Sequence, residues 1–273
     1  SKIILKKILF LNWWDFSGKG GISEQKFGFL YSRTFGLIEY YIDRIMRKIS
    51  DVNLVVSKGL LDKIERINPS AKNYLIRVGA NEYNQKFKFN FDNLKKYEYI
   101  FYCGALSKEE KSFVIQVSDY LNFNNNFNTK IVIAGTNIKT NSPNLISLGR
   151  LNDFQEIMSL IYYSKFCLLP LKNNVHNNLR WPSKISDYCS LGKVIVSTPL
   201  EQLNHNQDFC ICSTSDSVED YANEIYNAVN MNSKTVDQFE QKSFSFFERN
   251  LSNKKISVLI NSIYYDSVSA KND

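Results

Sequence analysis

The sequence has little of what a membrane span or an export signal requires. Its longest apolar runs, such as Phe166–Leu171, are far shorter than the roughly 20 residues that a transmembrane helix needs. The lysine-containing start, Ser1–Phe10, is followed by no small-residue cleavage site before Trp13 and Trp14. We therefore expect neither a transmembrane helix nor a signal peptide, and we expect a cytoplasmic protein, either free or peripheral to a membrane.

Histidine and cysteine are also scarce. The chain of 273 residues has two histidines and five cysteines, and Cys210 and Cys212 have no second pair or histidine cluster near them in the sequence. This spacing does not match that of a zinc site. We expect no metal site, and we expect the cysteines to be buried free thiols of a reducing compartment.

Positive charge exceeds negative charge, and the formal net charge is +7. An excess of this kind favours anionic partners, namely a nucleotide diphosphate, an acidic membrane surface or a nucleic acid. The lysines are scattered along the chain and do not form one stripe with interleaved aromatics, so no nucleic-acid partner is expected.

Apolar, β-branched runs alternate with helical periodicity, which predicts an α/β fold with parallel strands. In the first part the predicted strands are Ile3–Asn12, Asp51–Ser57 and Asn73–Val78, and the predicted helices are Phe35–Ser50 and Lys58–Ile67. Three strands are too few for a self-sufficient doubly wound sheet. Residues 1–83 are therefore interpreted as a partial Rossmann-like domain that ends near Tyr83.

The second part, residues 84–249, predicts a complete Rossmann-like domain. Its expected strands are Glu98–Gly104, Lys130–Gly135, Leu145–Gly149, Phe166–Pro170, Lys193–Thr198 and Asp208–Ser213. The expected helices between them are Lys108–Phe123, Asp153–Tyr163, Pro182–Leu191 and Asp216–Val229. Val236–Arg249 and Lys254–Val268 are amphipathic, and residues 250–273 are expected to pack back across the domain boundary.

The segment Leu168–Thr198 is the most informative stretch, and it reads LLPLKNNVHNNLRWPSKISDYCSLGKVIVST. Pro182 suits the first turn of a helix, which would leave the amides of Ser183 and Lys184 facing outward. Such a helix start, with Arg180 and Lys184 beside it, favours a phosphate, and Asp187 lies one turn below Ser183. The alternative is a proline-started helix whose charges are incidental.

This segment resembles the donor-site signature of family 4 glycosyltransferases and their relatives, which have the GT-B fold. In that signature a Pro-x-Lys segment precedes an acidic residue, a small turn and a strand of the Gly-Lys/Lys-Pro-Val-Val type. The matching residues are Pro182-Ser183-Lys184 and then Asp187 through Val196.

The resemblance continues in order over about residues 50–200. Asp51–Ser57 is similar to the family's strand Ala-Asp-x-Val-x-Val-Ser, and Val78–Asn81 is similar to its Asn-Gly-Val-Asp. Tyr102–Gly104 followed by Lys111 resembles the segment Val-Gly-Arg-Leu…Lys-Gly. Two further strand ends match at Ile133-Ala134-Gly135 and Leu148-Gly149-Arg150-Leu151.

The resemblance implies a role for each matched position. Lys111 would contact the donor diphosphate, Ser183 and Lys184 would bind phosphate, and Asp187 would take the place of the ribose-binding glutamate. Gly104 and Gly149 would lie in the donor site, the latter near the base. Two positions depart from the pattern: Ala105 stands where an arginine is expected, and Leu179 stands where many members have a sugar-binding glutamate. Arg180 is a candidate to replace the missing positive charge.

Near the N-terminus, Asn12–Gly21 resembles an Asp-Trp-Asp-Asp…Gly-Gly segment that some members have late in their first domain. The resemblance implies that Asp15, Gly20 and Gly21 line the acceptor side, with Asp15 as the catalytic candidate. Two alternatives stay open. The segment is either a buried tryptophan pair before a turn, or the first strand of a shortened domain with Gly20 and Gly21 in its phosphate loop.

The resemblance implies a metal-independent glycosyltransferase without a cofactor, which moves a sugar from a nucleotide diphosphate to an acceptor hydroxyl on a glycan, lipid or protein. Fixed cations and a helix N-terminus would stabilise the diphosphate as it leaves. The alternative is a non-catalytic donor-type module that docks to a partner subunit or self-associates. A sugar-nucleotide epimerase ranks third, because the sequence offers no acid/base pair for that reaction.

Overall fold

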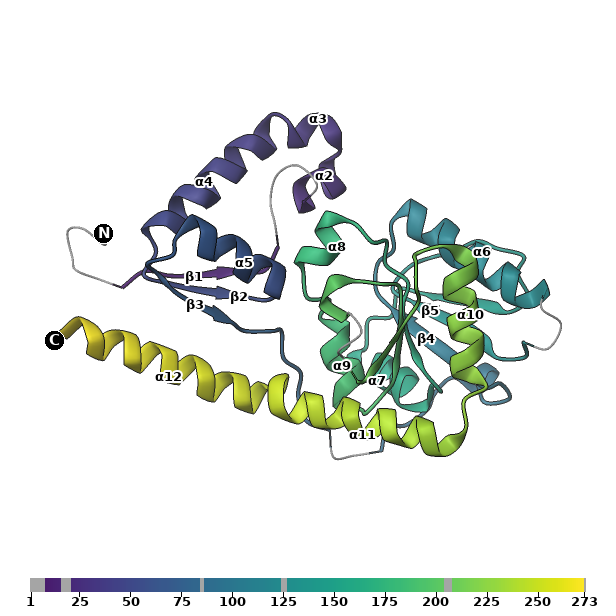
Figure 1. Cartoon of the computed structure of the whole chain (residues 1–273). Coiled ribbons are helices and arrows are strands. Elements are labelled where there is room, and N and C mark those ends of the chain that lie inside the picture. Colours follow the sequence, from purple (N-terminus) through teal and green to yellow (C-terminus); the bar gives the residue numbers. More distant parts are fainter. Residues whose placement is uncertain (1–7, 16–20, 84–85, 124–126, 204–207, 273) are drawn as a thin grey trace. The chain divides into compact units, whose positions relative to one another are not determined.

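In the computed structural model, residues 8–15, 21–83, 86–123, 127–203 and 208–272 are described. The chain divides into two compact units. Unit 1 comprises residues 1–79, 174–182 and 253–273, and unit 2 comprises residues 80–173 and 183–252. Each unit has its own parallel sheet, with three strands in unit 1 and six in unit 2 (Figure 1).

Unit 1 is built on a sheet with the strand order β1-β2-β3, in which neighbouring strands are parallel. The strands are β1 (Phe10–Trp13), β2 (Val52–Val55) and β3 (Lys72–Leu75). The helices are α2 (Ile22–Phe27), α3 (Phe29–Ser32), α4 (Phe35–Ile49), α5 (Lys58–Ile67), α8 (Val175–Leu179) and α12 (Asn253–Asn272). The predicted strands Asp51–Ser57 and Asn73–Val78 are confirmed. Of the predicted strand Ile3–Asn12, residues 1–7 lie outside the described residues, and the described part forms β1 from Phe10 to Trp13.

Local chemistry fixes the middle of unit 1. Ser57 begins α5 by accepting a hydrogen bond from the amide of Leu60 at 3.1 Å, and its hydroxyl donates to the carbonyl of Leu179 at 2.6 Å. Asn68 ends the helix, and its side-chain amide donates to the carbonyl of Arg47 at 2.8 Å. These bonds tie α4, α5 and α8 together around the end of β2.

Unit 2 has the strand order β6-β5-β4-β7-β8-β9, all parallel. The strands are β4 (Tyr99–Cys103), β5 (Lys130–Ala134), β6 (Leu145–Gly149), β7 (Cys167–Leu169), β8 (Ile195–Ser197) and β9 (Cys210–Cys212). The helices are η1 (Asp92–Leu94), α6 (Lys108–Phe123), α7 (Phe154–Tyr163), α9 (Lys184–Ser190), η2 (Glu201–Leu203), α10 (Val218–Val229) and α11 (Ser233–Asn250). All six predicted strands are confirmed. This order is that of a doubly wound dinucleotide-binding sheet.

The core of unit 2 lies between the sheet and the adjacent helices α6 and α10 (Figure 1). Ile100 and Tyr102 of β4 and Ile133 of β5 are buried here against Phe113 and Tyr221, whose rings stack at 5.6 Å. Tyr221 also donates a hydrogen bond to the carbonyl of Val196 at 2.9 Å. This packing fixes the positions of the carboxyl ends of the strands, and therefore the shape of the sheet edge that those ends form.

Three sequence-based expectations differ from the structure. The helix predicted from Pro182 begins at Lys184, after Ser183, whose side chain makes no capping hydrogen bond. Pro182 therefore lies two residues before the first residue of α9, and it is the last residue of the segment 174–182. Residues 174–182, which the sequence places in the second domain, group with unit 1. Of the five free cysteines only Cys167 and Cys189 are buried, and the other three are half-buried.

Candidate functional site in unit 2

The carboxyl ends of β4 and β7 mark a topological switch point. From β4 the chain proceeds outward through β5 to β6, and it then returns to place β7 on the opposite side of β4. The connections that follow the two adjacent strands thus leave in opposite directions, and in open α/β sheets ligands bind in the crevice that this creates. The residues directly after β4 and β7 are therefore the first candidates for a binding site.

Gly104 and Gly135 lie directly after β4 and β5 and bring the backbones of the two strand ends close together. We call this pair the glycine floor. Gly104 (φ +139°) donates from its amide to the carbonyl of Ala134 at 2.9 Å, and Gly135 (φ +90°) donates to the carbonyl of Gly149 at 2.7 Å. A Cβ added at Gly135 would lie 2.9 Å from the backbone nitrogen of Gly104, a distance that a side chain does not tolerate. Only glycine allows the two backbones to approach this closely.

Lys184 extends over this floor from the start of α9. A Cβ added at Gly104 would lie 3.0 Å from Cε and 3.2 Å from Nζ of Lys184. The ammonium group also lies 5.1 Å from the ring centroid of Tyr102, within the range of a cation–π contact. The positive charge is thus held at the end of β4, where a ligand of the switch-point crevice would meet it.

Asp187 lies one turn after Lys184 and is half-buried. Burial raises the pKa of its carboxyl group to about 6, although the positive charge of Lys184 acts in the opposite direction. The pKa of Tyr83 is raised by burial and further by the negative charge of Asp187. Asp187 therefore interacts electrostatically with both Lys184 and Tyr83.

Tyr188 anchors α9 to the sheet beneath these groups. Its side chain is fully buried, and its hydroxyl accepts a hydrogen bond from the amide of Cys103 at 3.1 Å. At the other end of the helix Ser190 donates to the carbonyl of Asp187 at 2.7 Å. Because the helix is held directly against the end of β4, the positions of Lys184 and Asp187 follow from the packing of unit 2 itself.

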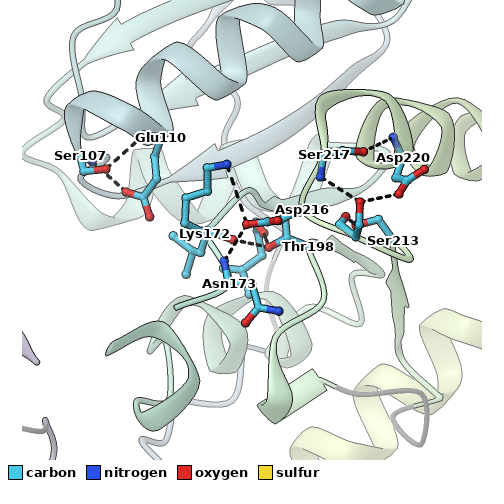
Figure 2. Close-up of polar contacts among 12 residues, drawn as sticks. Ser107, Glu110, Lys172, Asn173, Thr198, Ser213, Asp216, Ser217 and Asp220 are labelled. Carbon is cyan, nitrogen blue, oxygen red and sulfur yellow. Dashed lines mark hydrogen bonds and ion pairs between the residues drawn. The ribbon is translucent and has the colours of Figure 1, made fainter. Parts of the chain in front are cut away.

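The loops after β7 and β9 are tied together beside the switch point (Figure 2). Asp216 accepts a hydrogen bond from the amide of Asn173 at 3.2 Å, and its carboxylate lies 3.8 Å from Nζ of Lys172. The Lys172 ammonium is 4.9 Å from the ring centroid of Phe113. Thr198 donates to the carbonyl of Leu171. This network holds the loop through which the chain leaves β7.

The start of α6 is closed by a capping box. The amide of Glu110 donates to the hydroxyl of Ser107 at 3.2 Å, and Glu110 accepts from the amide of Ser107 at 2.8 Å (Figure 2). The side chain of Lys111 follows directly and is half-buried. Among the residues that the structure describes, Lys111 has no ion-pair partner. Its charge is therefore available at the same edge of the sheet.

The donor-site residues expected from the sequence fall into two groups. Gly104, Gly149, Lys184 and Asp187 lie in unit 2 and are joined by the contacts above, while Lys111 lies on the helix that follows β4. Ser183 is exposed beside Lys184. Arg180 groups with unit 1, where its Nε atom is buried without a hydrogen-bond partner among the described residues.

The acceptor-side candidates belong to unit 1. Asp15 is half-buried at the bend after β1, and Gly21 is buried at the position before α2. Gly20 lies outside the described residues.

Sequence reasoning gave no role in the site to three residues of this neighbourhood: Gly135, Tyr83 and Tyr188. Gly135 carried a visible signal, since a glycine directly after a buried strand indicates a close backbone approach. The tyrosines carried none, because their placement depends on long-range packing of α9 and of the segment after residue 79.

Two further features of the described residues concern metals and membranes. No three or more side chains of histidine, cysteine, aspartate or glutamate gather into a group able to hold a metal ion. None of the described helices combines the length and the apolar character needed to cross a bilayer.

Comparison with known proteins gives a consistent architecture. No family model matches the chain, and no curated protein sequence matches it. Solved structures do. A trehalose-6-phosphate synthase from Burkholderia multivorans superposes with a TM-score of 0.71 at 9% identity, over 98% of this chain and 68% of that chain. The chain has a GT-B-type fold.

Two more GT-B structures agree. A sucrose-phosphate synthase from Thermosynechococcus elongatus matches with a TM-score of 0.64 at 11% identity, over 84% of this chain and 61% of that one. An E. coli trehalose-6-phosphate structure bound with UDP-2-fluoro glucose matches with a TM-score of 0.64 at 10% identity, over 83% and 63%. The chain thus spans about 61–68% of the length of these GT-B chains.

Proposed function

We propose that this chain binds a nucleotide diphosphate-sugar through unit 2 and acts as a glycosyltransferase related to family 4. The observation that carries the proposal is the ammonium of Lys184 held over Gly104 at the switch point, with the carboxylate of Asp187 one turn away. A positive charge over a bare backbone edge suits a diphosphate, and a neighbouring carboxylate suits ribose hydroxyls. The GT-B structures, one of them bound with UDP-2-fluoro glucose, support this.

In this proposal the leaving diphosphate gains negative charge as the bond to the sugar breaks. Lys184 and Lys111 stabilise that charge without needing to move, because α9 and α6 are already packed against the sheet. Asp187 orients the nucleotide by accepting hydrogen bonds from the ribose. Gly104 lies beside the Lys184 ammonium that meets the diphosphate, and Gly149 lies at the end of β6, on the side of the base.

The acceptor is a hydroxyl group of a glycan or a lipid-linked sugar, and Asp15 is the proposed base that removes its proton. The proposal requires neither a cofactor nor a metal. Addition of EDTA should therefore leave nucleotide binding unchanged, while a chelator-sensitive affinity would contradict metal independence.

A thermal-shift panel with UDP, GDP, ADP and their glucose conjugates tests the donor site. A ligand that binds only the folded chain stabilises it by about 2.7 kcal/mol at a hundredfold excess over Kd, so the correct base should raise Tm clearly. Lys184→Ala should remove most of that increase. Lys165→Ala is the matched control, because Lys165 has the same charge but precedes β7 at the opposite end of the sheet.

No Tm increase with any nucleotide, or an equal loss in both variants, would overturn the proposed site. The second candidate function, a donor-type binding module without catalysis, is distinguished by turnover. Binding together with release of UDP or GDP from the sugar nucleotide supports the transferase. Binding without any release, by a chain given simple sugar acceptors, supports the module.

A further inference from the structure

Cys210 and Cys212 form a close thiol pair in unit 2. They lie two residues apart on β9, so that both side chains project from the same face of the strand. Their Sγ atoms are 3.6 Å apart. The other three free cysteines have hydroxyl partners instead: Cys103 contacts Tyr188, Cys167 contacts Ser164 and Cys189 contacts Ser243. The pair on β9 can therefore undergo chemistry that the other thiols cannot.

A metal ion does not account for the pair. Zinc sites in proteins use three or four protein ligands. Among the residues that the structure describes, no third histidine, cysteine, aspartate or glutamate joins Cys210 and Cys212 in a group able to hold a metal ion. Two adjacent thiols without further ligands are instead the arrangement that oxidation converts to a disulfide.

The two thiols are not equivalent. Because Cys212 donates its proton to the carbonyl of Leu203 at 3.0 Å, Cys210 is the donor between the two sulfurs. This hydrogen bond lowers the pKa of Cys212, although burial and the negative charge of Glu224 act in the opposite direction. Burial raises the pKa of Cys210 well above its ordinary value. The thiolate is the nucleophilic form of cysteine, so Cys212 is the sulfur that reacts first.

The position of β9 leaves the pair accessible. The strand is at the end of the sheet order and is hydrogen-bonded to β8 alone among the described strands. All three of its residues are half-buried, whereas those of β7 and β8 are buried. A disulfide places its sulfurs about 2.05 Å apart, so the two Sγ atoms must approach by about 1.5 Å. An edge strand with one neighbour can bend to allow this, and a small oxidant can reach it.

We propose that Cys210 and Cys212 are a modification site at which hydrogen peroxide forms a disulfide within one chain. The thiolate sulfur of Cys212 attacks one oxygen of the peroxide, the O–O bond breaks, and a sulfenic acid and hydroxide form. The sulfur of Cys210 then attacks the sulfenic sulfur, the S–O bond breaks, and a second hydroxide leaves. The protons of the two thiols convert both hydroxides to water. The dithiol thus loses two electrons, and the peroxide gains them.

The modification site lies at the sheet edge of the candidate functional site. Cys212 is paired with Ser197 at the carboxyl end of β8, and Ser213 follows it directly. Ser213 donates to the carbonyl of Ser215 at 2.7 Å, next to the Asp216 carboxylate that holds the loop after β7 (Figure 2). A bend of β9 at Cys212 therefore acts on the loops beside the switch point.

Peptide mass spectrometry of the peroxide-treated chain tests the proposal without any nucleotide, so its outcome is independent of the proposed function. The reduced chain is treated with a few-fold excess of hydrogen peroxide, denatured and labelled with N-ethylmaleimide. The tryptic peptide with Cys210 and Cys212 carries none of the other cysteines. It should be unlabelled and lighter than its reduced form by the mass of two hydrogen atoms. Dithiothreitol should restore labelling at both positions.

Single variants test the order of the two steps. Cys210→Ser should leave Cys212 as a sulfenic acid that dimedone traps, and Cys212→Ser should leave Cys210 as a free thiol. Cys103→Ser is the matched control, because it removes a half-buried thiol that contacts the hydroxyl of Tyr188, and it should form the disulfide like the wild type. The wild-type mass measurement decides the proposal even where a variant folds poorly.

Three results would overturn the proposal. The first is N-ethylmaleimide on both Cys210 and Cys212 of the wild-type chain after peroxide treatment. The second is a disulfide that joins either of them to another cysteine or to a second chain. The third is dimedone on Cys103, and not on Cys212, in the Cys210→Ser variant, since Cys212 would then not be the attacking sulfur.

Discussion

The parallel sheets of the two units are buried to different extents. In unit 2, β5, β7 and β8 are buried over almost their whole length, and helices cover the sheet. In unit 1, β1 and β3 have mostly half-buried or exposed residues, and α4 presents its apolar side outward. Parallel sheets are stable when both faces are covered, so unit 2 has the packing of a self-sufficient domain and unit 1 does not.

This contrast locates the proposed chemistry. A site that must hold a charge in place before a ligand arrives needs a rigid support, and the switch point of unit 2 provides one through Tyr188 and the glycine floor. Unit 1 instead exposes the apolar side chains of α4. Stability measurements on matched pairs of residues, one in each unit, test whether the two units differ in this way.

The largest difference is expected from truncating an isoleucine. Ile133→Ala removes a fully buried side chain from β5 and should lower the free energy of unfolding by about 4 kcal/mol, because a cavity forms in the core of unit 2. Ile45→Ala removes a 59% exposed side chain from α4 and should cost less than about 1 kcal/mol. Urea unfolding followed by circular dichroism measures both. Similar losses would show that α4 is not an open face of unit 1.

The next largest difference in stability is expected from substituting two glycines, one in each unit. Gly135 and Gly28 have nearly the same backbone angle, φ +90° and φ +86°, but a Cβ at Gly28 has nothing within 4 Å. Gly28→Ala should therefore cost only the backbone strain, about 2 kcal/mol, because φ +86° with ψ 175° is a region that glycine almost alone adopts. Gly135→Ala adds a clash with the backbone of Gly104 and should cost about 3 kcal/mol. If thermal denaturation gave equal costs, the close approach of the two strand ends would be refuted.

The stability of unit 2 should depend on pH because of Asp187. Its folded-state pKa of about 6 lies above the ordinary value of 3.8, so the folded chain retains the proton longer than the unfolded chain does. Stability should fall as pH rises from about 4 to about 6, and Asp187→Asn should be more stable than the wild type at pH 7 by about 2 kcal/mol. The two proteins should have equal Tm values near pH 3. A variant less stable at pH 7 would contradict the burial of this carboxylate.

The smallest effects should come from helix caps. Ser57→Ala in unit 1 and Ser217→Ala in unit 2 each remove a hydroxyl that accepts an amide hydrogen bond at the start of a helix. A lost cap typically costs about 1 kcal/mol. Ser57 should be the costlier of the two, because its hydroxyl is buried and also donates to the carbonyl of Leu179. Chemical denaturation curves compare them directly, and a larger loss at Ser217 would reverse the expectation.

Most of the fold was predictable from the sequence because its signals are local. Lys58–Ile67 and Lys108–Phe123 begin and end as predicted, since Ser57 and Ser107 mark their starts clearly. Strands such as Leu145–Gly149 carried short apolar runs that end at glycine. The start of α9 was misplaced by two residues, because a proline indicates a nearby helix start without fixing the first helical residue.

The orientation of α4 was not predictable from the sequence. Its periodicity identifies a helix with one apolar side, but not that the polar side would be the one to pack inward. The orientation of α4 depends on the ion pair of Arg47 with Asp43 of the same helix and on the contact of Arg47 with the ring of Trp13 in β1. The candidate site shows the same division: the motif around Lys184 is visible in the sequence, whereas its contact with Gly104 depends on tertiary packing.

The most direct test of the proposed donor site is a crystal structure of the chain with UDP bound. Diphosphate oxygens are expected within about 3 Å of Nζ of Lys184 above Gly104, and ribose hydroxyls within about 3 Å of the Asp187 carboxylate. A nucleotide bound elsewhere, with Lys184 still resting on Tyr102 and no contact to Asp187, would contradict it.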